Sequence, residues 1–264
     1  MNLNSQKPQL IGMVHVRALP GTPRHCHNID AIVETAINEA SQLEKAGFTA
    51  IILENMHDVP YLRGQVGPEI TAGMASIAYE VRQSVKIPIG IQILAGANEE
   101  ALCVAQAAEL NFIRVEGFVF SHIADEGMIE SCAGRLLRLR KELGAENIKI
   151  FADIKKKHSS HAITSDISIS ETAHAAEFFG VDGVILTGSA TGSEASPQEL
   201  HQVSKHVSIP VWIGSGVTPT NLIQYKEAQG WIVGSSLKEK GKWDQPLDPS
   251  ALNQMSSAFQ KLTR

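Results

Sequence analysis

The strongest constraint on the fold of this chain is a regular alternation of short apolar runs with helical patterns along its whole length. Residues 10–16 form the first apolar run, and apolar side chains then recur at spacings of three and four between Ile29 and Leu43, which is the period of a helix. Seven further strand-like runs follow, at 48–54, 88–94, 112–116, 148–155, 183–187, 211–214 and 231–233. Strands that alternate with helices in this way indicate a parallel sheet.

Eight strand–helix units fit the size of a closed (β/α)8 TIM barrel, which typically has about 250 residues. The remaining helices are predicted at 68–85, 98–108, 128–143, 166–179, 197–207, 219–228 and 250–262. We therefore predict one TIM-barrel domain over residues 1–264, with residues 1–9 as a polar N-terminal extension. A doubly wound open sheet is the alternative, although no G-x-G-x-x-G motif follows the first strand.

The charge and cysteine content exclude several classes of protein. With 23 basic and 28 acidic residues the net charge is −5, which disfavours nucleic-acid binding. No run approaches 18 apolar residues, and the polar N-terminus lacks the apolar centre of a signal peptide, so neither a membrane span nor secretion is expected. Three cysteines are too few for a disulfide framework and favour the reducing cytoplasm. A homo-oligomer is compatible with this composition, which does not decide it.

Polar residues occupy the predicted inward face of the strands near their carboxyl ends. In residues 148–155, for example, Ile148, Ile150, Ala152 and Ile154 form the apolar set that faces the helices, so the alternate side chains point inward. The inward polar set is His15, Glu54, Gln92, Arg114, Glu116, Asp153 and Lys155. TIM-barrel active sites lie at this end of the strands, and burying such groups for packing alone is costly. The alternative is an ionic layer that fills the barrel, with Arg114 paired to Glu116 and Asp153 to Lys155.

Asp153 and Lys155 are the most informative members, because they project side by side from one strand. The carboxylate can position the lysine, which then serves as a general acid or stabilises a developing oxyanion. A lysine in a dry pocket can also attack a carbonyl carbon. The predicted catalytic residues are Asp153, Lys155, Glu54, Glu116 and His15, and the predicted substrate-orienting residues are Gln92, Arg114, Asn55 and Thr187.

Glycine- and serine-rich loops follow the sixth, seventh and eighth strands. Residues 214–219 end in Thr218 and Pro219, which suit the cap and first position of a helix. Backbone N–H groups in such loops can approach an anion closely, and the loops after strands seven and eight are the usual phosphate site of barrels. The predicted phosphate-binding residues are Gly188 from the loop 187–192, together with Gly214, Ser215, Gly216, Gly234, Ser235 and Ser236. Ordinary turns between strand and helix are the alternative.

Histidines gather in two loops, at His25 and His27 and at His158 and His161. With His15 they offer nitrogen ligands for a divalent metal, but their spacing matches no zinc motif. We therefore predict no cofactor and no metal ligand, and keep a metal-dependent hydrolase as a third hypothesis.

The sequence also resembles the BtpA family, which is named for a photosystem I biogenesis protein. The matching motifs include Gly12-Met-Val-His15, Arg114-Val-Glu-Gly117, Ala152-Asp-Ile-Lys155, Ile213-Gly-Ser-Gly-Val-Thr218 and Trp231-Ile-Val-Gly-Ser-Ser-Leu-Lys238, and the resemblance runs from about residue 10 to the end. It implies a TIM barrel of the ribulose-phosphate-binding type and supplies no catalytic residues. The chain departs from many relatives at Glu116-Gly117-Phe118, where others are richer in asparagine.

Together these features favour an enzyme that acts on a small phosphorylated metabolite, such as a sugar phosphate or a nucleotide-like compound, by acid–base chemistry of the isomerase or lyase type. The family resemblance implies a second hypothesis, a non-enzymatic assembly or stability factor for photosystem I or another complex.

Overall fold

Eight parallel strands close into a barrel in the computed structural model, which describes residues 7–156, 158–188 and 193–263. Around the barrel the strands keep their order in the chain. They are β1 (Gln9–His15), β2 (Ala50–Glu54), β3 (Ile89–Gln92), β4 (Phe112–Val115), β7 (Lys149–Ile154), β9 (Gly183–Leu186), β10 (Val211–Ile213) and β11 (Gly230–Val233). The predicted TIM barrel is therefore confirmed, with each predicted strand displaced by a few residues at most.

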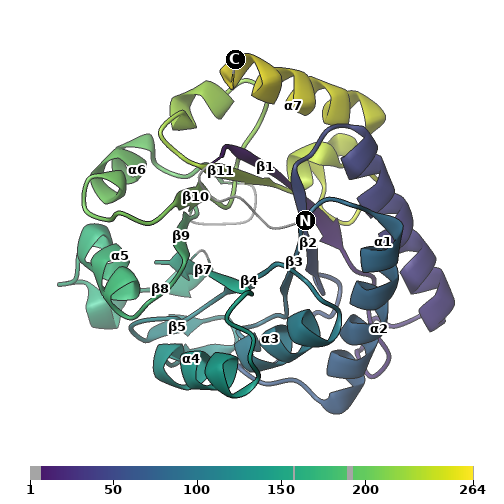
Figure 1. Cartoon of the computed structure of the whole chain (residues 1–264), viewed down its shortest axis with the longest axis horizontal. Helices are drawn as coiled ribbons and strands as arrows, with labels where there is room; N and C mark the ends of the chain where they lie inside the picture. Colours follow the sequence, from purple (N-terminus) through teal and green to yellow (C-terminus); the bar gives the residue numbers. More distant parts are fainter. Residues whose placement is uncertain (1–6, 157, 189–192, 264) are drawn as a thin grey trace.

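Helices surround this ring of strands (Figure 1). They are α1 (Ile29–Lys45), α2 (Pro68–Ser84), α3 (Asn98–Ala107), α4 (Ala133–Glu142), α5 (Ile169–Phe178), α6 (Pro197–Ser204) and α7 (Pro249–Leu262). Asn28 caps α1 and Ser168 forms a capping box with Glu171 on α5, so local sequence signals start both helices. Within the described residues no helix is both long and apolar enough to cross a membrane.

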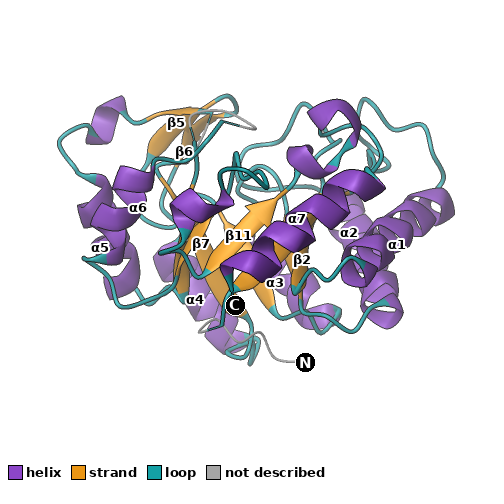
Figure 2. Cartoon of the chain, turned by 90° about the horizontal axis from the view of Figure 1, so that it is seen from above, coloured by secondary structure: helices purple, strands orange, loops and turns teal. Residues whose placement is uncertain are grey.

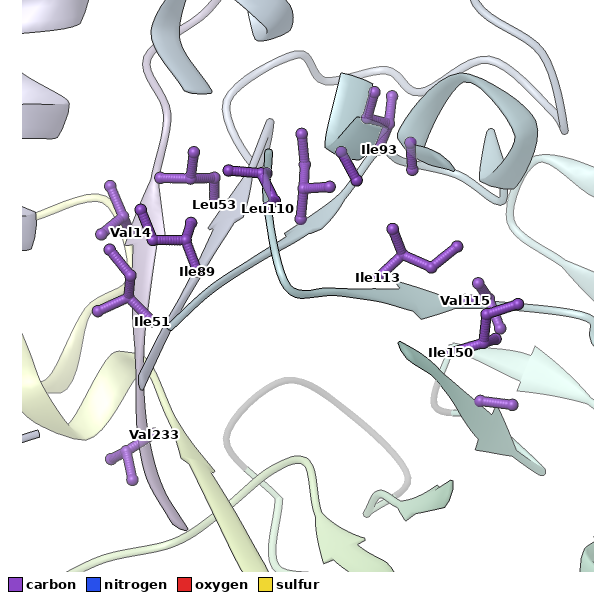
Figure 3. Packing of buried hydrophobic residues seen from close by; sticks show 14 of the residues in the cluster. Val14, Ile51, Leu53, Ile89, Ile93, Leu110, Ile113, Val115, Ile150 and Val233 are labelled. Carbon is purple, nitrogen blue, oxygen red and sulfur yellow. The ribbon is translucent and has the colours of Figure 1, made fainter. Parts of the chain in front are cut away.

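Two apolar layers hold the barrel together. The larger layer lies between strands and helices, and Figure 3 shows part of it, including Val14, Ile51 and Ile113. The smaller layer fills the barrel interior, where the rings of Phe151 and Trp212 stack with centroids 3.6 Å apart. Burial of these side chains supplies most of the stabilisation of such a fold.

Glycines in neighbouring strands make room for the large rings of the interior. A Cβ atom on Gly90 would come within 2.3 Å of the Phe112 ring, and one on Gly183 within 2.5 Å of Phe151. Because the rings fill the interior below, the polar residues at the carboxyl ends of the strands lie on top of a packed apolar layer and form a floor at the barrel mouth.

The predicted helix 128–143 is wrong in its first turn. Gly127–Ile129 is strand β6, which pairs antiparallel with β5 (His122–Ala124), and α4 begins only at Ala133. Gly127, the first residue of β6 after the turn, has a φ of +109°, and Met128 and Ile129 alternate between exposed and buried, which is the period of a strand.

This hairpin belongs to a small sheet of its own. β8 (Ser159–Ser160), from the loop after β7, pairs with β5, so the insertions after β4 and β7 join in the order β6-β5-β8. β4 and β7 are neighbours in the barrel, and this brings the two insertions together. In Figure 2 the small sheet lies beyond one end of the barrel strands, over the ends from which these loops leave.

The predicted helix 219–228 is also wrong. The described segment has only a short 3₁₀ helix, η2 (Leu222–Tyr225), between β10 and β11. Thr218 and Asn221 exchange two hydrogen bonds of 2.8 and 3.2 Å, and Asn221 also donates to the Gly216 carbonyl. These contacts close a turn where the sequence predicts the start of an α-helix.

Candidate active site

Two adjacent cavities lie at the carboxyl ends of the barrel strands, and Glu54, Met56 and Arg114 line both of them. The first, about 200 Å³ in volume, is lined by the loops after β10 and β11, at 214–218 and 234–236, and we call it the glycine lobe. The second, about 240 Å³, lies toward β3, β4 and the hairpin and contains four carboxylates, and we call it the acidic lobe. The side chains shared by both lobes mark the centre of the barrel mouth.

Serine hydroxyls hold the glycine lobe in shape. Ser215 Oγ accepts a hydrogen bond from the Gly188 N–H at 2.6 Å and donates to the Ser193 carbonyl at 2.9 Å. Ser236 Oγ donates to the Val217 carbonyl at 2.7 Å. Both hydroxyls therefore join neighbouring loops and fix the backbone around the cavity.

Backbone N–H groups of the loop after β11 precede the first turn of a short 3₁₀ helix, η3 (Ser235–Leu237). The first bonds of this turn run from Leu237 to the Gly234 carbonyl and from Lys238 to the Ser235 carbonyl. The N–H groups of Ser235 and Ser236 lie ahead of these bonds and have no acceptor within the turn. Such a group of donors suits an anion.

Two buried ion pairs cross the floor of the cavities. Arg114 donates through Nε and Nη2 to both carboxylate oxygens of Asp153, at 3.1 and 2.9 Å. Lys156 Nζ donates to Glu116 Oε2 at 2.8 Å, and Gln92 Nε2 donates to Glu116 Oε1 at 3.1 Å. The alternative pairing raised by the sequence, Arg114 with Glu116 and Asp153 with Lys155, is wrong for both cations, because Arg114 pairs with Asp153 and the Lys155 ammonium lies near the Thr164 carbonyl.

The carboxylates keep both cations protonated. Burial lowers the pKa of Arg114, but the charge of Asp153 and its hydrogen bond outweigh burial, so the net pKa is raised. For Lys156, burial likewise lowers the pKa, and the charge and hydrogen bond of Glu116 raise it further than burial lowers it. Lys156 is therefore an ammonium donor at neutral pH rather than a free amine nucleophile.

Lys155 does not point into either lobe. β7 ends at Ile154, and Lys155 adopts a φ of +46°, which interrupts the alternation of the strand. Its ammonium lies 3.4 Å from the Thr164 carbonyl, beside a narrow hollow under the hairpin, and Lys156 takes the inward place. The predicted inward orientation of Lys155 is wrong for this reason.

His15 and Glu54 face each other across the ends of β1 and β2. His15 Nε2 lies 3.8 Å from Glu54 Oε2, and His15 Nδ1 lies 2.9 Å from the Trp243 carbonyl. A carbonyl oxygen only accepts, so Nδ1 carries a proton and Nε2 is the atom that faces the carboxylate. The segment that carries Trp243 follows η3 and covers this side of the mouth.

The remaining predicted residues have different places. Gln92 and Arg114, which the sequence analysis predicts as orienting residues, line the acidic lobe. Asn55 lies beneath it and supports the loops, since its Oδ1 accepts from the Leu94 N–H at 2.7 Å and its Nδ2 donates to Asp58. Thr187 and Gly188 lie behind Gly214 and Ser215, and residues 189–192 of that predicted loop fall outside the described residues.

The histidine loops do not form a metal centre with the described residues. His122, in β5, and His161, directly after β8, have ring centroids 5.4 Å apart, while His57 packs on Trp243. In the part of the chain that the structure describes, no three His, Cys, Asp or Glu side chains are grouped as metal ligands would be. The geometry therefore adds nothing to the third hypothesis.

Sequence reasoning missed several lining residues, namely Met56, Tyr61, Asp125, Glu126, Lys156 and Trp243. All except Lys156 lie in loops beyond the strand ends, where strand alternation gives no orientation. The signal that could have identified Lys156 was the run of three lysines at 155–157, in which any one could be the inward residue.

Comparison with known proteins identifies relatives over nearly the full chain. A protein of Caenorhabditis elegans, described as uncharacterised and mitochondrial, is 49% identical and the match covers 99% of this chain and 96% of the relative. The photosystem I biogenesis protein BtpA of Synechocystis is 35% identical, over 91% of this chain and 84% of that protein.

Solved structures agree with the fold. A thiamine phosphate pyrophosphorylase from Pyrococcus furiosus has a TM-score of 0.61 at 16% identity and covers 98% of this chain and 99% of its own. A geranylgeranylglyceryl phosphate synthase from Thermoplasma acidophilum, in complex with sn-glycerol-1-phosphate, has a TM-score of 0.59 at 13% identity, over 97% and 94% of the two chains. A model of the BtpA family matches residues 6–261, and with relatives of this identity and coverage the chain belongs to the BtpA family.

Proposed function

We propose that this protein is an enzyme that acts on a small phosphorylated metabolite, a sugar phosphate or nucleotide-like compound, by acid–base chemistry of the isomerase or lyase type. The observation that carries the proposal is the junction of the two lobes. Glu54 and Arg114 lie between a lobe of backbone donors and a lobe of buried ionisable groups. A ligand anchored in the first lobe would extend its other end past these two side chains.

The phosphate group belongs in the glycine lobe. The N–H groups of Ser235 and Ser236 lie beside the glycine-rich segment 214–216, and oriented backbone amides favour negative charge, to which the Arg114 guanidinium in the lining of the same lobe adds. The names of the structural neighbours support this assignment, because a phosphate ester appears in that of the pyrophosphorylase and in the ligand of the synthase.

Proton transfer belongs to Glu54 in this proposal. It is buried, it lies at the centre of the mouth, and His15 is its neighbour. The Glu54 carboxylate takes a proton from the carbon or hydroxyl next to the reacting carbonyl and returns it to a neighbouring atom. Arg114 has five N–H donors, of which Asp153 takes two, and the Lys156 ammonium lies in the same lobe, so either can stabilise the oxyanion that forms.

The test separates binding from turnover. Thermal unfolding in the presence of inorganic phosphate and a panel of phosphate esters identifies ligands, since binding to the native state raises the melting temperature. With a ligand that turns over, Glu54→Gln should lower kcat by at least about 100-fold and leave the ligand-induced shift in melting temperature, since general acid–base catalysis typically contributes about 100- to 10,000-fold. Glu142→Gln, on the exposed side of α4, is the matched control and should leave both kcat and the ligand-induced shift unchanged. Equal activity of both variants would remove Glu54 from catalysis.

We place this activity in a reducing compartment, the cytoplasm, because all three cysteines are free. The assembly-factor hypothesis keeps one observation in its favour: Phe178 and Phe179, at the end of α5, are 81% and 49% exposed and line neither lobe. If no phosphate compound stabilises the protein, and Phe178→Ser abolishes capture of a partner complex, the assembly-factor hypothesis replaces the enzyme hypothesis.

A further inference from the structure

The acidic lobe contains a buried acceptor that no described group satisfies. Gln92 is only 2% exposed and lines this lobe, and its amide nitrogen is fixed by the hydrogen bond to Glu116. That bond orients the amide, so Oε1 is the atom left over, and it has no hydrogen-bond partner. A buried acceptor without a donor is energetically unfavourable, so a donor supplied from the lobe would be stabilising there.

A second acceptor in the acidic lobe is also buried without a hydrogen-bond partner. Glu126, in the turn of the β5–β6 hairpin, has its Oε2 atom buried and without a partner. The two residues come from different parts of the fold, one from a barrel strand and one from the insertion over it, yet both line the acidic lobe. Both unsatisfied atoms are oxygens, so the lobe requires hydrogen-bond donors from its occupant.

The charge of the lobe indicates what kind of donor fits. Its lining includes the carboxylates of Glu54, Glu116, Asp125 and Glu126 against two cations, Arg114 and Lys156. Both cations already have carboxylate partners, Asp153 and Glu116, within 3 Å. Among the described residues no Lys or Arg is paired with Asp125 or Glu126. A second anionic group would be repelled here, while a positively charged or N–H-bearing group would be attracted.

We propose, resting on the function above, that the substrate carries an amino group at the end opposite its phosphate, received by Gln92 Oε1 and Glu126. The substrate class is thus an aminated phosphate ester, in which the glycine lobe holds the phosphate and the acidic lobe holds the nitrogen. The aromatic rings of Tyr61 and Trp243, which also line this lobe, provide the apolar surface beside the amino group. Either an aliphatic ammonium or the amino edge of a heterocycle meets this description.

Pairs of ligands that differ in the amino group test the proposal. Calorimetric titration would compare glucosamine 6-phosphate with glucose 6-phosphate for the aliphatic ammonium, and CMP with UMP for the heterocycle. In at least one pair the amino member should bind at least ten-fold more tightly. Equal binding within both pairs, with inorganic phosphate still bound, overturns the amino-group proposal and leaves the phosphate site intact. If inorganic phosphate itself does not bind, the proposed function fails and this inference with it.

Two variants test whether Gln92 and Glu126 cause the preference for the amino member of each pair. Gln92→Leu removes the acceptor and should reduce the preference for the amino member to less than three-fold, with inorganic phosphate bound as before. Because this change also removes a hydrogen bond to Glu116, it can impair folding, and Glu126→Gln in the hairpin turn provides the second test. Glu126→Gln should lower the preference at least three-fold. An unchanged preference in Glu126→Gln and in any folded Gln92→Leu contradicts the assignment.

Discussion

Two adjacent lysines, Lys155 and Lys156, show how one backbone angle decides the role of a side chain. The positive φ of Lys155 turns the chain at the end of β7, so Lys156 enters the buried pair with Glu116 while Lys155 stays partly exposed. Strand alternation extended by one residue gives the opposite assignment. Positive φ at a non-glycine residue is uncommon and has no sequence signature here, so the run of lysines suggests an inward cation without indicating which lysine it is.

We expect the two lysines to differ in their contribution to stability. Lys156→Met leaves the Glu116 carboxylate buried without its cation, which should lower the free energy of unfolding by roughly 3–5 kcal/mol. Lys155→Met, the matched control, loses only a hydrogen bond of 3.4 Å at a partly exposed site and should change it by no more than about 1 kcal/mol. Urea denaturation measures both, and a larger loss in Lys155→Met would reverse the assignment.

At the scale of elements, the barrel could be predicted because every strand and most helices have their own periodic pattern. Met13, Ile52 and Phe151 lie in the interior as strand alternation predicts. The small sheet could not be predicted, because β5, β6 and β8 are only two or three residues long and pair through insertions that are distant in sequence. The segment 219–228 shows the converse error, where good helix-start residues are used to close a turn.

The loop after β10 depends on a glycine for both its conformation and its packing. Gly216 has a φ of +70°, and a Cβ atom there would lie 2.4 Å from the Glu194 Cα atom and from the Ser193 carbonyl oxygen. Because this contact is with backbone, the neighbouring loop would have to move, and that loop is joined to Ser215.

We therefore expect Gly216→Ala to destabilise the protein at the glycine lobe by more than the strain of a positive φ alone would. Gly144→Ala is the control, since Gly144 has a φ of +62° with nothing within 4 Å of an added Cβ, and should cost only about 1 kcal/mol of unfolding free energy. Gly216→Ala should cost at least about 2 kcal/mol and weaken phosphate binding. Differential scanning calorimetry with and without phosphate would decide, and equal losses in the two variants would argue against the packing role.

At the scale of the whole molecule, stability should depend on acidity through buried histidines. Burial, and next the charge of Lys156, lower the pKa of His122 from 6.5 to about 4. The unfolded chain then binds this proton more readily than the folded one, so the neutral ring contributes stability that is complete above pH 6.5 and is lost as the pH falls toward 4.

The expected loss from His122 between pH 6.5 and 4 is up to about 3 kcal/mol of unfolding free energy, at 1.36 kcal/mol for each unit of pKa. The pKa of His57 is also lowered to about 4, first by burial and then by the charge of Arg17. His57 should therefore add to the same loss of stability with falling pH. His122→Gln should make the unfolding free energy depend less steeply on pH, and the part of the dependence that comes from His57 should remain. Stability curves from pH 4 to 7 for both proteins measure this, and parallel curves would exclude His122 as a contributor.

The homo-oligomer compatible with the sequence stays a prediction, as does the extent of a single domain over residues 1–264. The fold and the family are established at this scale, while the chemistry depends on side chains that only the closed barrel brings together, such as Arg114 with Asp153, 39 residues apart.

The half-buried position of Trp243 has a practical consequence. The protein has three tryptophans, and Trp212 and Trp231 are almost completely buried, whereas Trp243 lines the acidic lobe beside His57. A molecule entering that lobe changes the surroundings of one indole while the other two stay constant. Intrinsic fluorescence therefore gives a label-free signal of occupancy, and a Trp243→Phe protein supplies the blank against which it can be read.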